Sequence, residues 1–236
     1  MSTTRKTVLF IVEGSSDKAA LEKIFRSIYK NNKRIDFKFA DGDISSDETT
    51  TKENVEARIY KIVQEYMKDK KLTKSDIYQI VQLFDTDGAY IPETSIVFGG
   101  AYQITYSTAN IICRDIQKVV SRNKLKSSIM DYLLGIQNIR DIPYSMYFMS
   151  CNLDHALYDE INLDKDLKQD YADAFYERFI GKERKFIEFL RSEVVNGVPD
   201  TFNGSWRYIK EGLHSLERHT NLHIYFVQNP LPDGLY

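Results

Sequence analysis

The stretch QLFDTDGAY, residues 82–90, places two carboxylates, Asp85 and Asp87, at the end of an apolar run. Two explanations of this pattern are open. Asp and Gly are common turn residues, because Asp hydrogen-bonds to nearby backbone and Gly tolerates positive φ. Alternatively, the two carboxylates belong to a functional site. The rest of the chain has to decide between a plain turn and a site.

The composition is that of a globular protein without a strong overall charge. The chain has 236 residues, of which 42% are hydrophobic, enough for one large core or two small ones. Its 32 Lys and Arg residues nearly balance 34 Asp and Glu residues, which excludes a global basic field but not a local basic groove.

The beginning of the chain and its cysteines bear on localisation. The apolar run before Glu13 is too short for a signal peptide or a membrane span. Cys113 and Cys151 stand outside any spacing that suggests zinc or a disulfide framework, which favours a reducing compartment. We therefore expect a cytoplasmic protein without a membrane association.

Strand and helix patterns alternate along the chain, which predicts an α/β fold with a mainly parallel sheet flanked by helices. The apolar, β-branched run Val8–Val12 is typical of a strand buried on both faces. Apolar residues at helical spacing follow from Asp17, with Ser15 and Ser16 as expected caps. The further expected strands are 35–39, 77–84 and 144–149, the polar segment 41–54 is expected to be an exposed loop, and the expected helices are 55–68 and 107–123.

The chain is expected to divide near residue 160. Residues 1–160 form the predicted α/β core, and residues 161–236 a mostly helical extension. In that extension we expect helices over 163–195 and 205–218, then a final strand over 222–227 that completes or caps the core.

Acidic residues follow three of the expected strands. Glu13 follows the first strand, Asp85 and Asp87 the third, and Asp154 the fourth. Because the carboxyl ends of parallel strands share one edge, where ligands bind, these side chains should lie close together. Crowded carboxylates repel unless a cation neutralises them, and oxygen ligands suit Mg²⁺ or Mn²⁺. Metal-assisted phosphoryl chemistry is the natural use of such a site.

Two of these segments resemble a known family. FIVEGSSD, residues 10–17, and LFDTDG, residues 83–88, resemble the two motifs of the toprim domain, found in topoisomerases, primases, OLD-type nucleases and small nuclease effectors of phage defence. The resemblance covers roughly the first half of the chain. It implies a Mg²⁺ site made by Glu13, Asp85 and Asp87, and a nuclease that cleaves DNA or RNA, such as tRNA.

A fainter resemblance links the segment YFMSCNLDHALYDE, residues 147–160, to RloB-like proteins, a toprim-related defence family. It implies that Asp154 stands at the family's acidic position and is a candidate fourth catalytic residue. The family usually has Glu with an aromatic neighbour there, whereas this chain has Asp followed by His155. Small toprim effectors are often paired with a separate ATPase, and this chain has no ATPase motif of its own.

Three alternatives stay open at this point. The toprim-like core could be a non-catalytic module that binds nucleic acid or a partner, and a homo-oligomer is compatible with either function. The motif around Asp85 also resembles the first motif of HAD-type phosphatases, but it lies on the third strand, and no later Gly-Asp-x-x-x-Asp completes that site. Glu13 and Asp17 also suit a structural role at a helix N-terminus. The helix dipole favours an acid there by about 0.3 to 1 kcal/mol.

The other polar residues are predicted to be structural more often than functional. His155, beside an apolar helix, is expected to be a bonded structural residue, and the remaining histidines show no metal-binding pattern. Two basic groups could line a phosphate track, but most such groups are solvated helix faces. The first group is Lys118, Arg122, Lys124 and Lys126, and the second is Arg207, Lys210 and Arg218 around Trp206.

Overall fold

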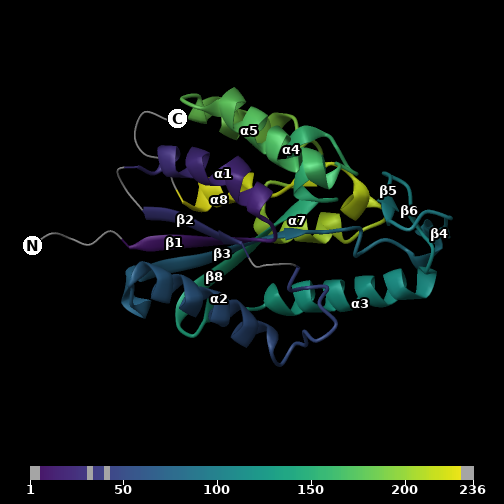
Figure 1. The fold of residues 1–236 in the computed structure, drawn as a ribbon, viewed down its shortest axis with the longest axis horizontal. Coiled ribbons are helices and arrows are strands. Elements are labelled where there is room, and N and C mark those ends of the chain that lie inside the picture. Colours follow the sequence, from purple (N-terminus) through teal and green to yellow (C-terminus); the bar gives the residue numbers. More distant parts are fainter. Residues whose placement is uncertain (1–5, 31–33, 40–42, 230–236) are drawn as a thin grey trace, which may run out of the picture.

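A mostly parallel sheet forms the centre of the computed structural model, which describes residues 6–30, 34–39 and 43–229 (Figure 1). Four neighbouring strands run parallel to one another, in the order β2, β1, β3, β8. They span Arg34–Phe39 (β2), Thr7–Val12 (β1), Ile77–Asp85 (β3) and Ile142–Ser150 (β8). Two short strands, β7 (Asn138–Ile139) and β9 (His219–Thr220), pair with β8 in the antiparallel direction. The α/β class and the four expected strands are confirmed.

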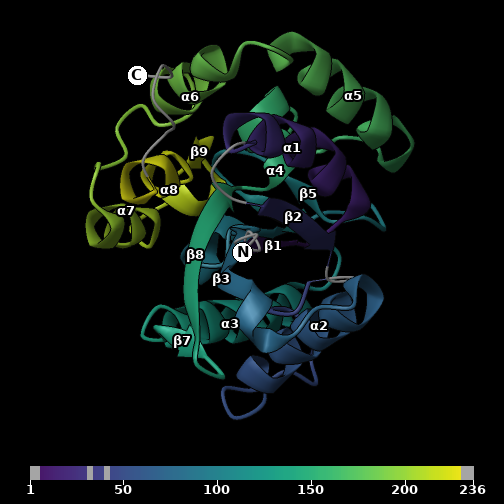
Figure 2. The same ribbon diagram turned by 90° about the vertical axis from the view of Figure 1, so that its left-hand side faces the viewer.

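Helices cover both faces of the sheet (Figures 1 and 2). One face carries α1 (Ser15–Ile28), α5 (Lys168–Phe179), α6 (Glu183–Ser192) and α8 (His223–Gln228). The other carries α2 (Val55–Lys70) and α3 (Ile116–Leu133), and α4 (Leu153–Tyr158) and α7 (Phe202–Ile209) lie next to β8. The strands are buried on both sides, since Phe10 belongs to the hydrophobic cluster of the first face and Leu9 to that of the second.

A second, three-stranded sheet lies at the amino end of α3, and its presence corrects the expected helix over residues 107–123. β4 (Ile96–Phe98), β6 (Ile111–Cys113) and β5 (Thr105–Tyr106) form this sheet. The carboxylate of Asp115 accepts a hydrogen bond from the backbone N of Lys118 at 2.9 Å, which caps α3. Helix α3 therefore begins after the β-branched pair Ile111-Ile112 and continues ten residues beyond the expected end, to Leu133.

The expected final strand over residues 222–227 is also wrong, because α8 occupies this segment. The ring centre of Tyr225 in α8 lies 5.1 Å from that of Phe10, and the ring centre of Phe226 lies 5.2 Å from that of Phe25. Short apolar runs are compatible with a strand or a buried helix, and periodicity alone does not separate the two.

Smaller corrections concern helix ends. Gly14, rather than Ser15 or Ser16, is the residue before α1. The helical stretch expected over 163–195 is divided into α5 and α6 at Gly181, whose φ of 67° is left-handed. The helix expected over 205–218 is α7 and ends at Ile209.

Residues on both sides of position 160 share one hydrophobic cluster, in which Phe25 contacts Phe186 and Phe226. The division of the chain at residue 160 stays a prediction. In the described ranges, none of the helices combines the length and the apolar character that a membrane crossing requires.

Candidate functional site

Acidic side chains gather where the four parallel strands end. Glu13 follows β1, Asp85 is the last residue of β3, and Asp87 comes two residues later. Asp43 comes after β2, the neighbour of β1 on its other side. We call Glu13, Asp43, Asp85 and Asp87 the carboxylate cluster. Strand order alone brings these residues together, because parallel strands deliver their carboxyl ends to the same edge.

A lysine from α3 lies inside the carboxylate cluster. The side chain of Lys126 is fully buried, and its Nζ lies 2.6 Å from Asp43 Oδ2 and 2.5 Å from Asp87 Oδ2. Glu13 Oε1 is 3.8 Å from the same Nζ. One carboxylate oxygen from each of these three acids lies within 4.8 Å of the other two. The three carboxylates therefore share one ammonium group.

One lysine does not compensate all the charge of the carboxylate cluster. Burial, together with repulsion from neighbouring carboxylates, raises the pKa values of Glu13 and Asp85 well above their usual range. Burial also opposes ionisation of Asp43, but Lys126 and the hydroxyls of Ser45 and Ser46 outweigh it and lower the pKa of Asp43 to about 2. The site thus favours the uptake of a proton or a further cation.

The segment after β3 combines a turn with the acidic site. Asp87 and Gly88 both have left-handed φ angles, 48° and 67°, as in an ordinary turn. Yet Asp87 points its carboxylate at Lys126, and Asp85 Oδ1 accepts a hydrogen bond from the backbone N of Leu153 at 2.9 Å. The turn and the acidic cluster suggested by the sequence are therefore both present here.

Asp154 lies outside the group of oxygens around Lys126. Its Oδ2 is 2.5 Å from Lys168 Nζ, whereas its buried Oδ1 has no hydrogen-bond partner among the described residues. Asp17 senses the charge of Asp154, since burial and then that charge raise the pKa of Asp17. Asp17 also accepts a hydrogen bond from Gly14 N at 2.8 Å, the helix-start role expected of it.

Three charged residues of this site were not predicted from the sequence to belong to it: Asp43, Lys126 and Lys168. The polar segment 41–54 was expected to be an exposed loop, which is wrong for the buried residues Ile44, Ser45 and Thr50, whereas residues 41 and 42 lie outside the described ranges. Asp43 satisfies the rule that selected the other acids, since it follows a parallel strand. Lys126 was grouped with a basic run, although it falls on the helical stripe of α3 that also carries Val119, Asn123, Met130 and Leu133, all buried.

His155, Arg218 and Trp206 are held in structural contacts. His155 Nδ1 accepts a hydrogen bond from Cys151 N at 3.1 Å, and burial lowers the pKa of this imidazole to about 4. Arg218 Nε donates to the carbonyl oxygens of His155 and Ala156 at 3.0 and 3.2 Å. Trp206 is buried in the core, so it does not form a surface track with Arg218 and its neighbours.

The donor set of the carboxylate cluster fits a divalent cation. All its side-chain donors are carboxylate oxygens, which Mg²⁺ and Mn²⁺ prefer. Oxygens of Glu13, Asp43 and Asp87 already lie around the ammonium of Lys126, so a cation bound by these three acids has to share them with Lys126 or displace it. Asp85 is not one of the three acids grouped around Lys126, and its Oδ1 accepts from Leu153 N instead.

In comparisons with known proteins, no family model, curated protein or solved structure matches this chain. Its function therefore has to be inferred from the side chains at the carboxyl edge of the sheet.

Proposed function

We propose that the protein is a divalent-metal-dependent nuclease of the toprim type, which cleaves phosphodiester bonds in DNA or RNA. The observation that carries the proposal is the carboxylate cluster itself, in which half-buried acids follow neighbouring parallel strands and three of them share the single ammonium of Lys126. A site of this kind at the carboxyl edge of an α/β sheet is suited to ligand binding. A role in phage defence and a separate ATPase partner are further parts of the proposal that come from the motif resemblance alone.

In this proposal, Glu13, Asp85 and Asp87 hold Mg²⁺ or Mn²⁺, with Asp43 next to them and Asp154 as a further acidic residue. A metal ion supplies charge that polarises a phosphate and lowers the pKa of bound water. The chain itself supplies the fixed positions of the carboxylates, since Asp85 is held by Leu153 N. It also supplies Lys126, a second positive charge beside the place where an anionic phosphate needs compensation.

A non-catalytic binding module is the second candidate, and one observation favours it. Lys126 already contacts three carboxylates, so the cluster is partly neutralised without any metal. A HAD-type phosphatase is less well supported, because the motif around Asp85 lies on the third strand of the chain and no later Gly-Asp-x-x-x-Asp completes that site.

Nuclease assays with matched variants test the proposal. Purified protein is incubated with Mg²⁺ or Mn²⁺ and a panel of single- and double-stranded DNA and RNA, including tRNA. We expect Glu13→Gln and Asp85→Asn to lower cleavage at least about 100-fold, the scale of losing one key electrostatic group. Asp141→Asn is the control, because Asp141 is 92% exposed and pairs with Lys74 away from the cluster. Cleavage that survives in Glu13→Gln and Asp85→Asn would show that the reacting site lies elsewhere.

A further inference from the structure

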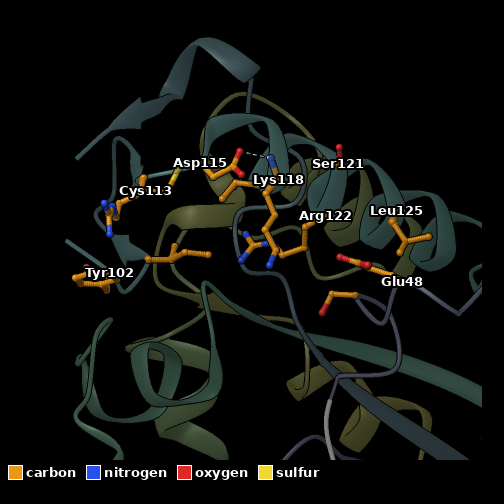
Figure 3. A pocket seen from close by; sticks show the side chains of 12 residues that line it. Glu48, Tyr102, Cys113, Asp115, Lys118, Ser121, Arg122 and Leu125 are labelled. Carbon is orange, nitrogen blue, oxygen red and sulfur yellow. Dashed lines mark hydrogen bonds between the residues drawn. The ribbon is translucent and has the colours of Figure 1, made fainter. Parts of the chain in front are cut away.

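A cavity of about 610 Å³ opens beside the carboxylate cluster, along the amino-terminal half of α3 (Figure 3). This volume falls within the range of about 300–1,000 Å³ that is typical of ligand sites. Figure 3 shows Lys118 and Arg122 pointing into the space between Tyr102 on one side and Glu48 on the other. The cavity is thus a built feature of the fold next to the proposed reaction site.

Three basic side chains line the cavity: Arg114, Lys118 and Arg122. Within the described part of the chain, none of the three forms an ion pair with a carboxylate. Arg122 donates instead to the hydroxyl of Tyr106, to the side-chain oxygen of Asn123 and to the backbone oxygen of Asp87, whereas Arg114 and Lys118 are exposed. Two acids also line the cavity, but Asp115 caps α3 and Glu48 lies across from Lys118. Arg114 and Lys118 are therefore available to an anion, and Arg122 adds a fixed positive charge to the cavity wall.

An exposed aromatic ring stands at the same cavity. Tyr102 is 91% exposed, and the guanidinium of Arg114 lies 4.3 Å from the centre of its ring. Flat aromatic rings next to basic groups are the usual means by which proteins bind unpaired bases and the phosphates between them. A duplex keeps its bases stacked on one another and cannot offer a free face to Tyr102.

The cavity wall continues into the carboxylate cluster. Arg122 Nη2 donates to the backbone oxygen of Asp87 at 3.0 Å. Ser46, which lines the cavity, donates its hydroxyl to the carboxylate of Asp43. A chain of phosphates on Lys118 and Arg122 therefore reaches the neighbourhood of both Asp43 and Asp87.

We infer that this cavity binds single-stranded nucleic acid, with a base on Tyr102 and phosphates at Arg114, Lys118 and Arg122. The role of this cavity in delivering substrate rests on the proposed nuclease function. Binding itself needs neither metal nor cleavage, so the two proposals can be tested separately.

The test is fluorescence anisotropy in EDTA, with labelled single-stranded DNA, single-stranded RNA and the corresponding duplexes. We expect Tyr102→Ala to weaken single-strand binding about 5- to 150-fold, the loss of one base–aromatic stack. We expect Lys118→Gln to weaken binding and to make the slope of log K against log salt shallower by about 0.7, the value for one phosphate contact on a single strand. The DNA and RNA arms show which single strand is preferred.

Matched controls come from the same protein. Lys124→Gln changes an exposed lysine of α3 that pairs with Glu93 at 2.7 Å and does not line the cavity. Tyr78→Ala removes another exposed tyrosine, at the end of β3 away from Asp85. Thermal melts establish that all variants are folded. The inference is overturned if wild-type protein does not bind single strands, if duplex binds as tightly, or if the controls weaken binding as much as the cavity variants. Asp85→Asn should bind single strands as the wild type does. If this variant binds but no longer cleaves, the inference about the cavity still holds.

Discussion

Lys126 is the residue on which the electrostatics of the site depend. Burial alone would lower its pKa, but Asp43, Asp87 and Glu13 raise that pKa well above the usual value, so the side chain is charged. In return, its charge is the main influence that lowers the pKa of Asp43 to about 2 against the effect of burial. The lysine and the acids are therefore buried only as a set, since a buried charge without its partner is costly.

Replacing this lysine should destabilise the fold in a pH-dependent way. We expect Lys126→Met to lower the free energy of unfolding by about 3–5 kcal/mol at pH 7, because it leaves buried carboxylates without their cation. In the wild type, the low pKa of Asp43 contributes stability above pH 3.8, which is lost as the pH falls toward 2. Without Lys126, burial favours the protonated acids. The deficit of the variant, which is its loss of unfolding free energy relative to the wild type, should therefore shrink as the pH falls toward 4.

Urea unfolding at pH 7 and pH 4.5 measures this change in the deficit. Lys124→Met is the control and should change the free energy of unfolding by less than about 1 kcal/mol, because Lys124 forms an exposed pair with Glu93. A deficit of the same size at both pH values would mean that Lys126 contributes packing rather than charge.

Among the secondary-structure elements, the short helix α4 matters most for the site, because its first residue, Leu153, holds Asp85. Arg218 donates to two carbonyl oxygens, those of His155 and Ala156, near the end of this helix. We expect Arg218→Met to lower the free energy of unfolding by about 1.5–3 kcal/mol, the value of hydrogen bonds from a charged donor. Arg184→Met, which removes an exposed pair with Glu188, should stay within about 0.5 kcal/mol. Equal losses in the two variants, measured by urea unfolding, would contradict the role of Arg218.

The helix α8 gives a second prediction at this scale. Tyr225 is fully buried against Phe10 and Tyr147, yet its hydroxyl has no hydrogen-bond partner in the described ranges. We expect Tyr225→Ala to cost about 3–5 kcal/mol of unfolding free energy, as other aromatic truncations in cores do. Tyr225→Phe should be neutral or stabilising, because it removes an unpaired buried hydroxyl. A large loss in Tyr225→Phe, measured by thermal or urea unfolding, would reveal a partner for the hydroxyl.

Elements were predictable from sequence where one pattern dominates. The run Val8–Val12 is apolar throughout, the apolar stripe of α1 has a clear helical period, and both elements are confirmed. Residues 222–227 form a short apolar run that suits a strand as well as a buried helix, and only packing against Phe10 and Phe25 decides in favour of the helix. The start of α3 depended on Asp115, one polar residue among several with similar capping ability.

At the scale of the whole molecule, strand order explains how much of the site was accessible from sequence. Glu13, Asp85 and Asp87 could be placed at one edge because each follows a recognisable strand. Lys126 comes from a helix and Lys168 from the beginning of α5, and no local pattern says which acids they meet. Asp43 lies between these cases, since its strand was expected but its loop was taken to be exposed.

Metal-linked stability tests the whole assembly of strands and acids without a known substrate. In the wild type, Mg²⁺ or Mn²⁺ at ten times its Kd should add about 1.4 kcal/mol to the free energy of unfolding. For a chain of this size, that gain corresponds to a rise in Tm of about 3–6 °C. A plain turn at Asp85 and Asp87 predicts no such rise, and a loss of up to about 2 kcal/mol when Asp85 is replaced.

Asp85→Asn and Lys126→Met should change this response in opposite directions. The pKa of Asp85 is raised in the folded protein, so its contribution to stability is present below the unfolded pKa and is lost as the pH rises through the folded value. Asp85→Asn should therefore stabilise the metal-free protein at pH 7.5 and keep the hydrogen bond from Leu153, yet lose most of the gain from metal. Lys126→Met should gain more from metal than the wild type, because the cation no longer competes with an ammonium for Asp43 and Asp87. Thermal melts in EDTA and in several millimolar Mg²⁺ or Mn²⁺ measure both responses. If wild type and Lys126→Met are both indifferent to metal, the lysine is the resident cation, and the cluster belongs to a binding module rather than to a nuclease.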